Sequence, residues 1–279
     1  MKEFNGKVAV ITGGASGIGY AMAERFAAEG MKLAVADIHQ PSLDEAAAKL
    51  RASGAKVLAE KVDVADAGQV EAFAEAVYRG YGAVHVLCNN AGVTNPAQQA
   101  WKMSLDRWKW VLGVNLWCVI NGVNAFFPRM IAAGEEGHVV NTGSVAGLMA
   151  GGTGSGVAYA TSKHAVVALS ECLYSELKSS GSALSASVLC PGTVDTDILA
   201  HAARDDPRRP GAAPTRLAEI HRDALAASWV AGEVIAAIAE DRFYIVASQP
   251  AWLEAIRDRY ARIERGDNPG LPPANGRQQ

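Results

Sequence analysis

A tyrosine and a lysine four positions apart, Tyr159 and Lys163, have the residue types and spacing of a proton-transfer pair. In a helix, residues four apart lie on one face, so both side chains would reach the same space. An ammonium beside a phenol favours the phenolate and would lower the pKa of Tyr159 from about 10 towards neutrality, as general acid–base catalysis requires. The pair alone is weak evidence, because helices contain this spacing by chance.

A glycine-rich segment follows the first apolar run of the chain and precedes a helical pattern. It reads Thr12-Gly13-Gly14-Ala15-Ser16-Gly17-Ile18-Gly19. Glycines let backbone N–H groups and a helix N-terminus approach a pyrophosphate, and Gly19 lets the helix pack closely on the strand. A plain glycine-rich turn is the alternative, but the position within the first β–α–β unit favours a dinucleotide.

An acidic residue, Asp37, stands at the end of the second apolar run. A carboxylate there can accept hydrogen bonds from both ribose hydroxyls of NAD and would repel the 2′-phosphate of NADP. Neither Ser16 nor Ile38 supplies the cation that an NADP site uses. The sequence therefore predicts NAD as cofactor, the alternative being that Asp37 is a surface cap ahead of Pro41.

Positioning these residues needs a regular scaffold, and the chain alternates short β-branched runs with helical patterns. Strands are predicted at residues 8–12, 32–36, 56–62, 84–89, 138–142, 183–189 and 243–247. Helices are predicted at residues 17–29, 41–53, 66–81, 104–133 and 158–179, the fourth as two helices meeting near 113–115. The fold class is α/β: a single doubly wound, Rossmann-type domain with a seven-stranded parallel sheet covered by helices on both faces.

The domain is expected to occupy residues 1–265. It includes a substrate lid at about 195–229, where a charged, proline-broken loop interrupts the pattern, and a C-terminal helix. Residues 266–279 are rich in Gly, Pro, Asn and Gln and are predicted to be a disordered tail. The cations Arg204, Arg208 and Arg209 are expected to be solvated, or alternatively to close over a phosphate.

The composition restricts the partners. Apolar residues make up 49% and the formal net charge is −3, so no basic field gathers nucleic acid or anionic lipid. No uncharged apolar stretch reaches the ~20 residues that a membrane span needs, and no signal peptide precedes the first strand, so a cytoplasmic protein is expected. None of the six histidines forms a pair at helical ligand spacing, and no metal site is predicted.

Together these motifs resemble the short-chain dehydrogenase/reductase family. The resemblance covers about residues 4–248 and rests on seven signals in the expected order: TGGASGIG from Thr12, Asp63-Val64, NNAG from Asn89, Asn115, Ser144, Tyr159 with Lys163, and PGTVDT from Pro191.

The resemblance implies a role for each matching residue. Asp63 and Val64 would lie at the adenine, Asn90 along the cofactor, and Val194 with Thr196 at the nicotinamide carboxamide. Tyr159 would exchange a proton with the substrate oxygen, while Ser144 hydrogen-bonds that oxygen. Lys163 would hold the nicotinamide ribose, and Asn115 would anchor a water-linked proton path, giving the four predicted catalytic residues Asn115, Ser144, Tyr159 and Lys163. The resemblance also implies a homodimer or homotetramer.

One spacing departs from the family's pattern. Tyr159 follows Ser144 by fifteen positions, two more than the family commonly shows, and the extra residues fall in a glycine-rich stretch at 151–156. Ser144 is predicted to be the catalytic serine because the preceding strand fixes its position. Ser155 is the alternative.

The residues expected around the reacting centre are apolar: Val93, Leu148, Met149, Val157, Ile198 and Leu199. They favour a hydrophobic or aryl secondary alcohol or ketone as substrate, and Trp101 is a candidate contact to a bulky one. Alternatives are a non-catalytic NAD-binding regulator, an NADP-dependent carbonyl reductase, and an epimerase or dehydratase, for which the chain is short and the glycine spacing differs.

Overall fold

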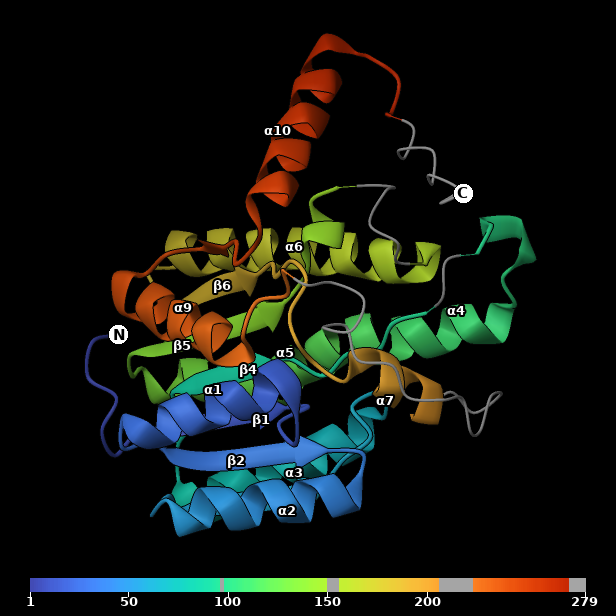
Figure 1. The fold of residues 1–279 in the computed structure, drawn as a ribbon. Helices are drawn as coiled ribbons and strands as arrows, with labels where there is room; N and C mark the ends of the chain where they lie inside the picture. The colour runs from blue at the N-terminus through green and yellow to red at the C-terminus, as the bar shows by residue number, and fades with distance from the viewer. Residues whose placement is uncertain (96–97, 150–155, 206–222, 271–279) are drawn as a thin grey trace.

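The computed structural model describes residues 1–95, 98–149, 156–205 and 223–270. Its centre is a seven-stranded parallel sheet with strand order β3-β2-β1-β4-β5-β6-β7 (Figure 1). The strands are β1 (Val8–Thr12), β2 (Lys32–Asp37), β3 (Val57–Lys61), β4 (Val86–Asn89), β5 (Gly137–Thr142), β6 (Leu184–Leu189) and β7 (Tyr244–Ile245). The predicted α/β fold class and the seven strands are confirmed.

The strand order places β1 between β2 and β4, and this decides where a site can form. Ile11 of β1 pairs with Val35 on one side and Cys88 on the other. The chain leaves the carboxyl ends of β1 and β4 in opposite directions, which opens a crevice at that edge of the sheet. The glycine-rich segment and the NNAG segment both follow these two strands.

Helices cover both faces of the sheet because its strands are apolar on both sides. On one face Met22, Phe26 and Ile238, from α1 (Gly17–Ala28) and α9 (Ala227–Glu240), pack with residues of β1 and β2. On the other face Phe73 and Phe126, from α3 (Ala67–Tyr81) and α5 (Cys118–Ala133), pack on β1 and β4 together with residues of α6 (Val157–Ser179). Helix α2 (Gln40–Ala52) packs beside β2 and β3.

The two helices predicted within 104–133 are present and are joined without a gap. Helix α4 (Leu105–Leu112) continues through a π-helical turn (Gly113–Trp117) into α5. By length and composition this helix could cross a membrane, but half of its most apolar window is buried inside the protein, as in core helices of soluble proteins. The predicted junction is therefore real, but it is a widened turn rather than a gap.

The segment after β6 begins with α7 (Ile198–Asp205), and α10 (Pro250–Arg265) follows β7. The backbone of Asp195 donates to Leu225 O at 2.8 Å, so both described ends of the predicted lid meet. Helix α10, all of whose residues are described, has no fully buried side chain and projects from the body in Figure 1. Residues 206–222 of the lid and 271–279 of the predicted tail lie outside the described residues.

Candidate active site

One cavity at the carboxyl edge of the sheet brings together most of the residues that the sequence predicts. It is lined by Gly13, Ser16, Gly17, Ile18, Asp37, Asp63, Val64, Asn90, Ser144, Tyr159, Lys163, Val194 and Thr196. Two further predicted residues, Gly19 and Asn115, are buried behind its wall.

The glycine-rich segment at residues 12–19, called the cradle below, needs glycine where other atoms approach its backbone closely. A Cβ on Gly13 would lie 2.8 Å from Ala91 Cα, and the backbone there has a φ of +63°, which disfavours other residues. A Cβ on Gly19 would overlap Gly13 O and the Asn90 side chain. Because no side chain fills this space, the N-terminus of α1 opens into the cavity, and the arrangement fits the pyrophosphate of a dinucleotide.

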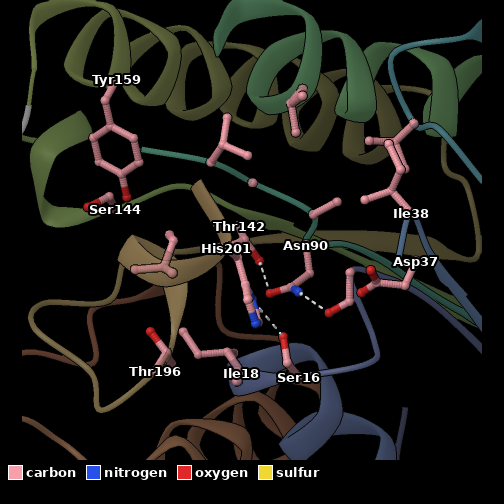
Figure 2. Close-up of a pocket in the computed structure, with 18 of the residues that line it drawn as sticks. Ser16, Ile18, Asp37, Ile38, Asn90, Thr142, Ser144, Tyr159, Thr196 and His201 are labelled. Atoms are coloured by element: carbon pink, nitrogen blue, oxygen red, sulfur yellow. Dashed lines mark hydrogen bonds between the residues drawn. The ribbon is translucent and has the colours of Figure 1, made fainter. Parts of the chain in front are cut away.

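Asn90 ties the cradle to the neighbouring strands. Its Nδ2 donates to Thr12 O at 3.1 Å and to Gly13 O at 3.3 Å, while its Oδ1 accepts from Thr142 Oγ1 at 3.2 Å (Figure 2). These bonds connect the ends of β1 and β5 through one side chain. The cradle is therefore held in shape before any ligand binds.

Asp37 stands at the cavity edge with both carboxylate oxygens engaged. Oδ2 accepts from Ala15 N at 3.2 Å and Oδ1 from His39 N at 3.1 Å. Beside it the Ile38 side chain is exposed and lines the same cavity. The carboxylate is thus fixed beside the cradle, where a ribose of the dinucleotide would lie.

The turn after β6 closes the opposite side of the cradle. Thr196 Oγ1 donates to Val194 O at 3.5 Å. A Cβ on Gly17 would lie 3.0 Å from the Thr196 methyl carbon. The predicted nicotinamide-side residues therefore lie directly against the start of α1.

The hydroxyl groups of Ser144 and Tyr159 lie near each other in the cavity (Figure 2). Ser144 follows β5, and its Oγ accepts from Ala146 N at 3.1 Å and donates to Pro191 O at 3.5 Å. The longer spacing to Tyr159 therefore does not displace Ser144 from the cavity. The competing Ser155 lies outside the described residues.

In this structure the pKa of Tyr159 is raised, whereas the sequence predicted a lowered one. Burial raises the pKa of Tyr159, and the hydrogen bond with Ser144 offsets only part of that rise. Lys163 Nζ lies 5.6 Å from the centre of the phenol ring and donates to Thr142 O at 2.8 Å. Burial lowers the pKa of Lys163 itself to about 8. The ammonium therefore lies over the phenol ring and is held at the end of β5.

Asn115 lies in the π-helical turn and is 1% exposed. Its Oδ1 accepts from Val93 N at 2.7 Å, and its Nδ2 donates to Val93 O at 2.9 Å and to Ser162 Oγ at 3.0 Å. Ser162 Oγ in turn donates to Tyr159 O at 2.6 Å. The side chain therefore joins the loop after β4 to the start of α6, and its place in a proton path stays a prediction.

Lining residues that sequence reasoning missed include Lys109 and Trp110 of α4, and His201 of α7. Arg204, expected to be solvated, is exposed and also reaches the cavity rim. Trp101, by contrast, is 80% exposed. The three-residue spacing of Ile198, His201 and Arg204 could have shown that they share one face of a helix in the lid.

Comparison with known proteins agrees with this arrangement. The family model described as short chain dehydrogenase matches residues 7–207. The 1-deoxy-11-beta-hydroxypentalenate dehydrogenase of Streptomyces exfoliatus is 36% identical over 274 residues, covering 98% of this chain and 93% of that protein.

Two solved structures are similar over nearly the whole chain. A short chain dehydrogenase/reductase from Burkholderia phymatum in complex with NAD superposes with a TM-score of 0.90 at 44% identity, covering 98% of this chain and 99% of that one. LigD in its apo form, from Sphingobium sp. strain SYK-6, superposes with a TM-score of 0.79 at 28% identity, covering 96% of this chain and 100% of that one. The chain therefore belongs to the short-chain dehydrogenase/reductase family, a family of oxidoreductases that use a nicotinamide cofactor.

Proposed function

We propose that the protein is an NAD(H)-dependent oxidoreductase that interconverts a hydrophobic or aryl secondary alcohol and its ketone. The observation that carries the proposal is the position of the Ser144 and Tyr159 hydroxyls in the same cavity as the glycine cradle and Asp37. Proton-transfer groups and a dinucleotide site are thus within reach of one substrate.

In alcohol oxidation the substrate O–H bond and the adjacent C–H bond both break. Ser144 Oγ and Tyr159 Oη hold the substrate oxygen, and Tyr159 takes the hydroxyl proton as general base. When bound, the oxidised nicotinamide supplies the hydride acceptor and a positive charge. In ketone reduction Tyr159 returns the proton to the oxygen.

Lys163 acts on the phenol rather than on the substrate. Because burial raises the pKa of Tyr159, the neutral phenol is favoured until positive charge stands nearby. The Lys163 side chain comes from the same face of α6, and its ammonium is held at Thr142 O, next to the cradle. We assign it the tasks of stabilising the phenolate and holding the nicotinamide ribose.

The preference for NAD over NADP rests on charge at the cavity edge. The fixed Asp37 carboxylate would repel a 2′-phosphate, and neither Ser16 nor Ile38 offsets it. The similar Burkholderia structure in complex with NAD supports the same choice.

The substrate class rests on the apolar side chains near the reacting groups. Val93 and Ile198 line the cavity, and Leu148 and Met149 are buried after Ser144. These apolar side chains favour a hydrophobic alcohol over a sugar. Relatives named for a hydroxypentalenate support a hydroxyl-bearing substrate.

The test is absorbance at the reduced-nicotinamide band, with NAD and NADP each tried against aryl carbinols, aliphatic secondary alcohols and small polyols. Turnover of an apolar secondary alcohol with NAD is the expected result. Turnover with NADP alone contradicts the assignment of Asp37, and preference for polyols contradicts the substrate class.

A further inference from the structure

Helix α7 turns one stripe of side chains towards the cavity. Ile198, His201 and Arg204 are spaced three apart, so they share a helix face, and all three line the cavity. The adjacent Ala202 is buried in a cluster with Val111 of α4. The helix is therefore packed against the body of the protein with the His201 stripe facing the cofactor site.

The imidazole of His201 lies at the mouth of the glycine cradle. His201 Nδ1 and Ser16 Oγ are 3.4 Å apart, within hydrogen-bonding distance (Figure 2). Ser16 is the residue before α1, and within the described chain its side chain caps none of the helix N–H groups. The N-terminus of α1 therefore opens towards a space that Ser16 and His201 border together.

The cradle itself supplies no cationic side chain for a pyrophosphate. Residues 12–19 contain neither lysine nor arginine, so the anion would depend on backbone N–H groups and the helix dipole. A histidine at the mouth can add a hydrogen bond to a phosphate oxygen, and a stronger one when protonated.

We propose that His201 binds the pyrophosphate of the dinucleotide together with Ser16, so that α7 is part of the cofactor site as well as of the substrate lid. This assignment rests on the proposed dinucleotide-dependent function. Because Ile198 and His201 line the same cavity from one face of α7, a dinucleotide bound to His201 would hold Ile198 in the cavity wall.

The experiment measures binding rather than turnover. The Kd of NADH is obtained from its fluorescence in titrations of the whole protein, and ADP-ribose and adenosine are compared by displacing NADH. His201→Ala should weaken NADH and ADP-ribose about tenfold, because both carry the pyrophosphate, and leave adenosine within about twofold. His201→Asn, which keeps a polar group near the position of Nδ1, should recover most of the loss.

Two controls separate this role from damage to the fold. Alanine is the strongest helix former, so His201→Ala does not weaken α7 through helix propensity. His85→Ala removes a histidine just before β4 that accepts a hydrogen bond from Val8 N, and should leave all three affinities unchanged.

An unchanged NADH Kd in His201→Ala overturns the assignment, as does an equal loss for NADH, ADP-ribose and adenosine. If the unsubstituted protein fails to bind NADH at all, the proposed function fails and the assignment with it.

Discussion

The cradle side and the lid side of the cavity are held in different ways. Residues of the cradle side follow directly on buried strands, and Asn90 bonds the ends of β1 and β5 to one another. The lid side comes from α7, which is attached through the turn after β6 and through the buried Ala202.

The two sides of the cavity are therefore expected to serve different functions. Chemistry and cofactor binding need fixed distances, which strand ends supply, whereas substrate choice varies with the elements added above them. The cradle side should therefore show large effects on rate and cofactor, and the lid side, apart from His201, smaller effects on substrate.

The largest effect is expected at Ser144. Ser144→Ala removes a hydrogen-bond donor to the substrate oxygen and should lower kcat by about 10²–10³-fold while leaving the NADH Kd within about twofold. Single-turnover kinetics and NADH titration measure the two quantities, with Ser180→Ala at the end of α6 as control. Near-normal turnover, combined with an inactive Ser155→Ala, would show that the wrong serine was assigned.

Acid should destabilise the rigid sheet through His138 of β5. Burial lowers the pKa of His138 to about 4, against about 6.5 in an unfolded chain. The contribution of neutral His138 to the stability of the fold is complete above pH 6.5. It falls by ~1.4 kcal/mol per pH unit down to about pH 4, because in that range only the unfolded chain takes up the proton. The free energy of unfolding, measured by urea titration, should fall by ~3 kcal/mol across that range.

The matched variant for this prediction is His138→Gln, whose Nε2 can replace the contact to Ser187 Oγ. This variant should reduce the slope of the free energy of unfolding against pH between pH 6.5 and 4. An unchanged slope would mean that other groups cause the acid loss.

A smaller change, about a hundredfold in cofactor preference, is expected at Asp37. Asp37→Ala should weaken NADH about tenfold by removing a charged acceptor, and should strengthen NADPH about tenfold by removing the repulsion. Fluorescence titration with both cofactors measures the ratio, with Asp44→Ala on α2 as control. Equal weakening of both cofactors would indicate that Asp37 only supports the cradle through Ala15 N.

The smallest effect, on the lid side, is expected at Ile198. Ile198→Ala should raise KM for an apolar alcohol about fivefold by removing apolar contact, with the NADH Kd unchanged. Leu199→Ala, at the neighbouring position of α7, should change KM less. A loss of NADH affinity instead would show that Ile198, like His201, belongs to the cofactor site.

Sequence reasoning succeeded where local signals and chemistry coincide. Buried parallel strands are apolar runs, and Gly13 and Asp37 follow such runs directly, so the cradle side could be located from the chain alone. Ser144 could be placed for the same reason, since it follows β5.

The same reasoning failed where the outcome depends on packing between distant segments. The spacing correctly put Lys163 beside Tyr159, but burial, which the spacing does not show, raises the pKa of the phenol. The contact of His201 with Ser16 joins residues far apart in the chain, and the spacing along α7 shows which residues share a face but not what that face contacts.

The most direct test of the central claim combines the absorbance assay with a Tyr159→Phe variant. The unsubstituted protein should reduce NAD with an apolar secondary alcohol. The variant should lose at least about 10³-fold in kcat, because no group then exchanges the proton, and should bind NADH with an unchanged Kd. Turnover within tenfold of the unsubstituted protein would contradict the claim that Tyr159 is the general acid and base.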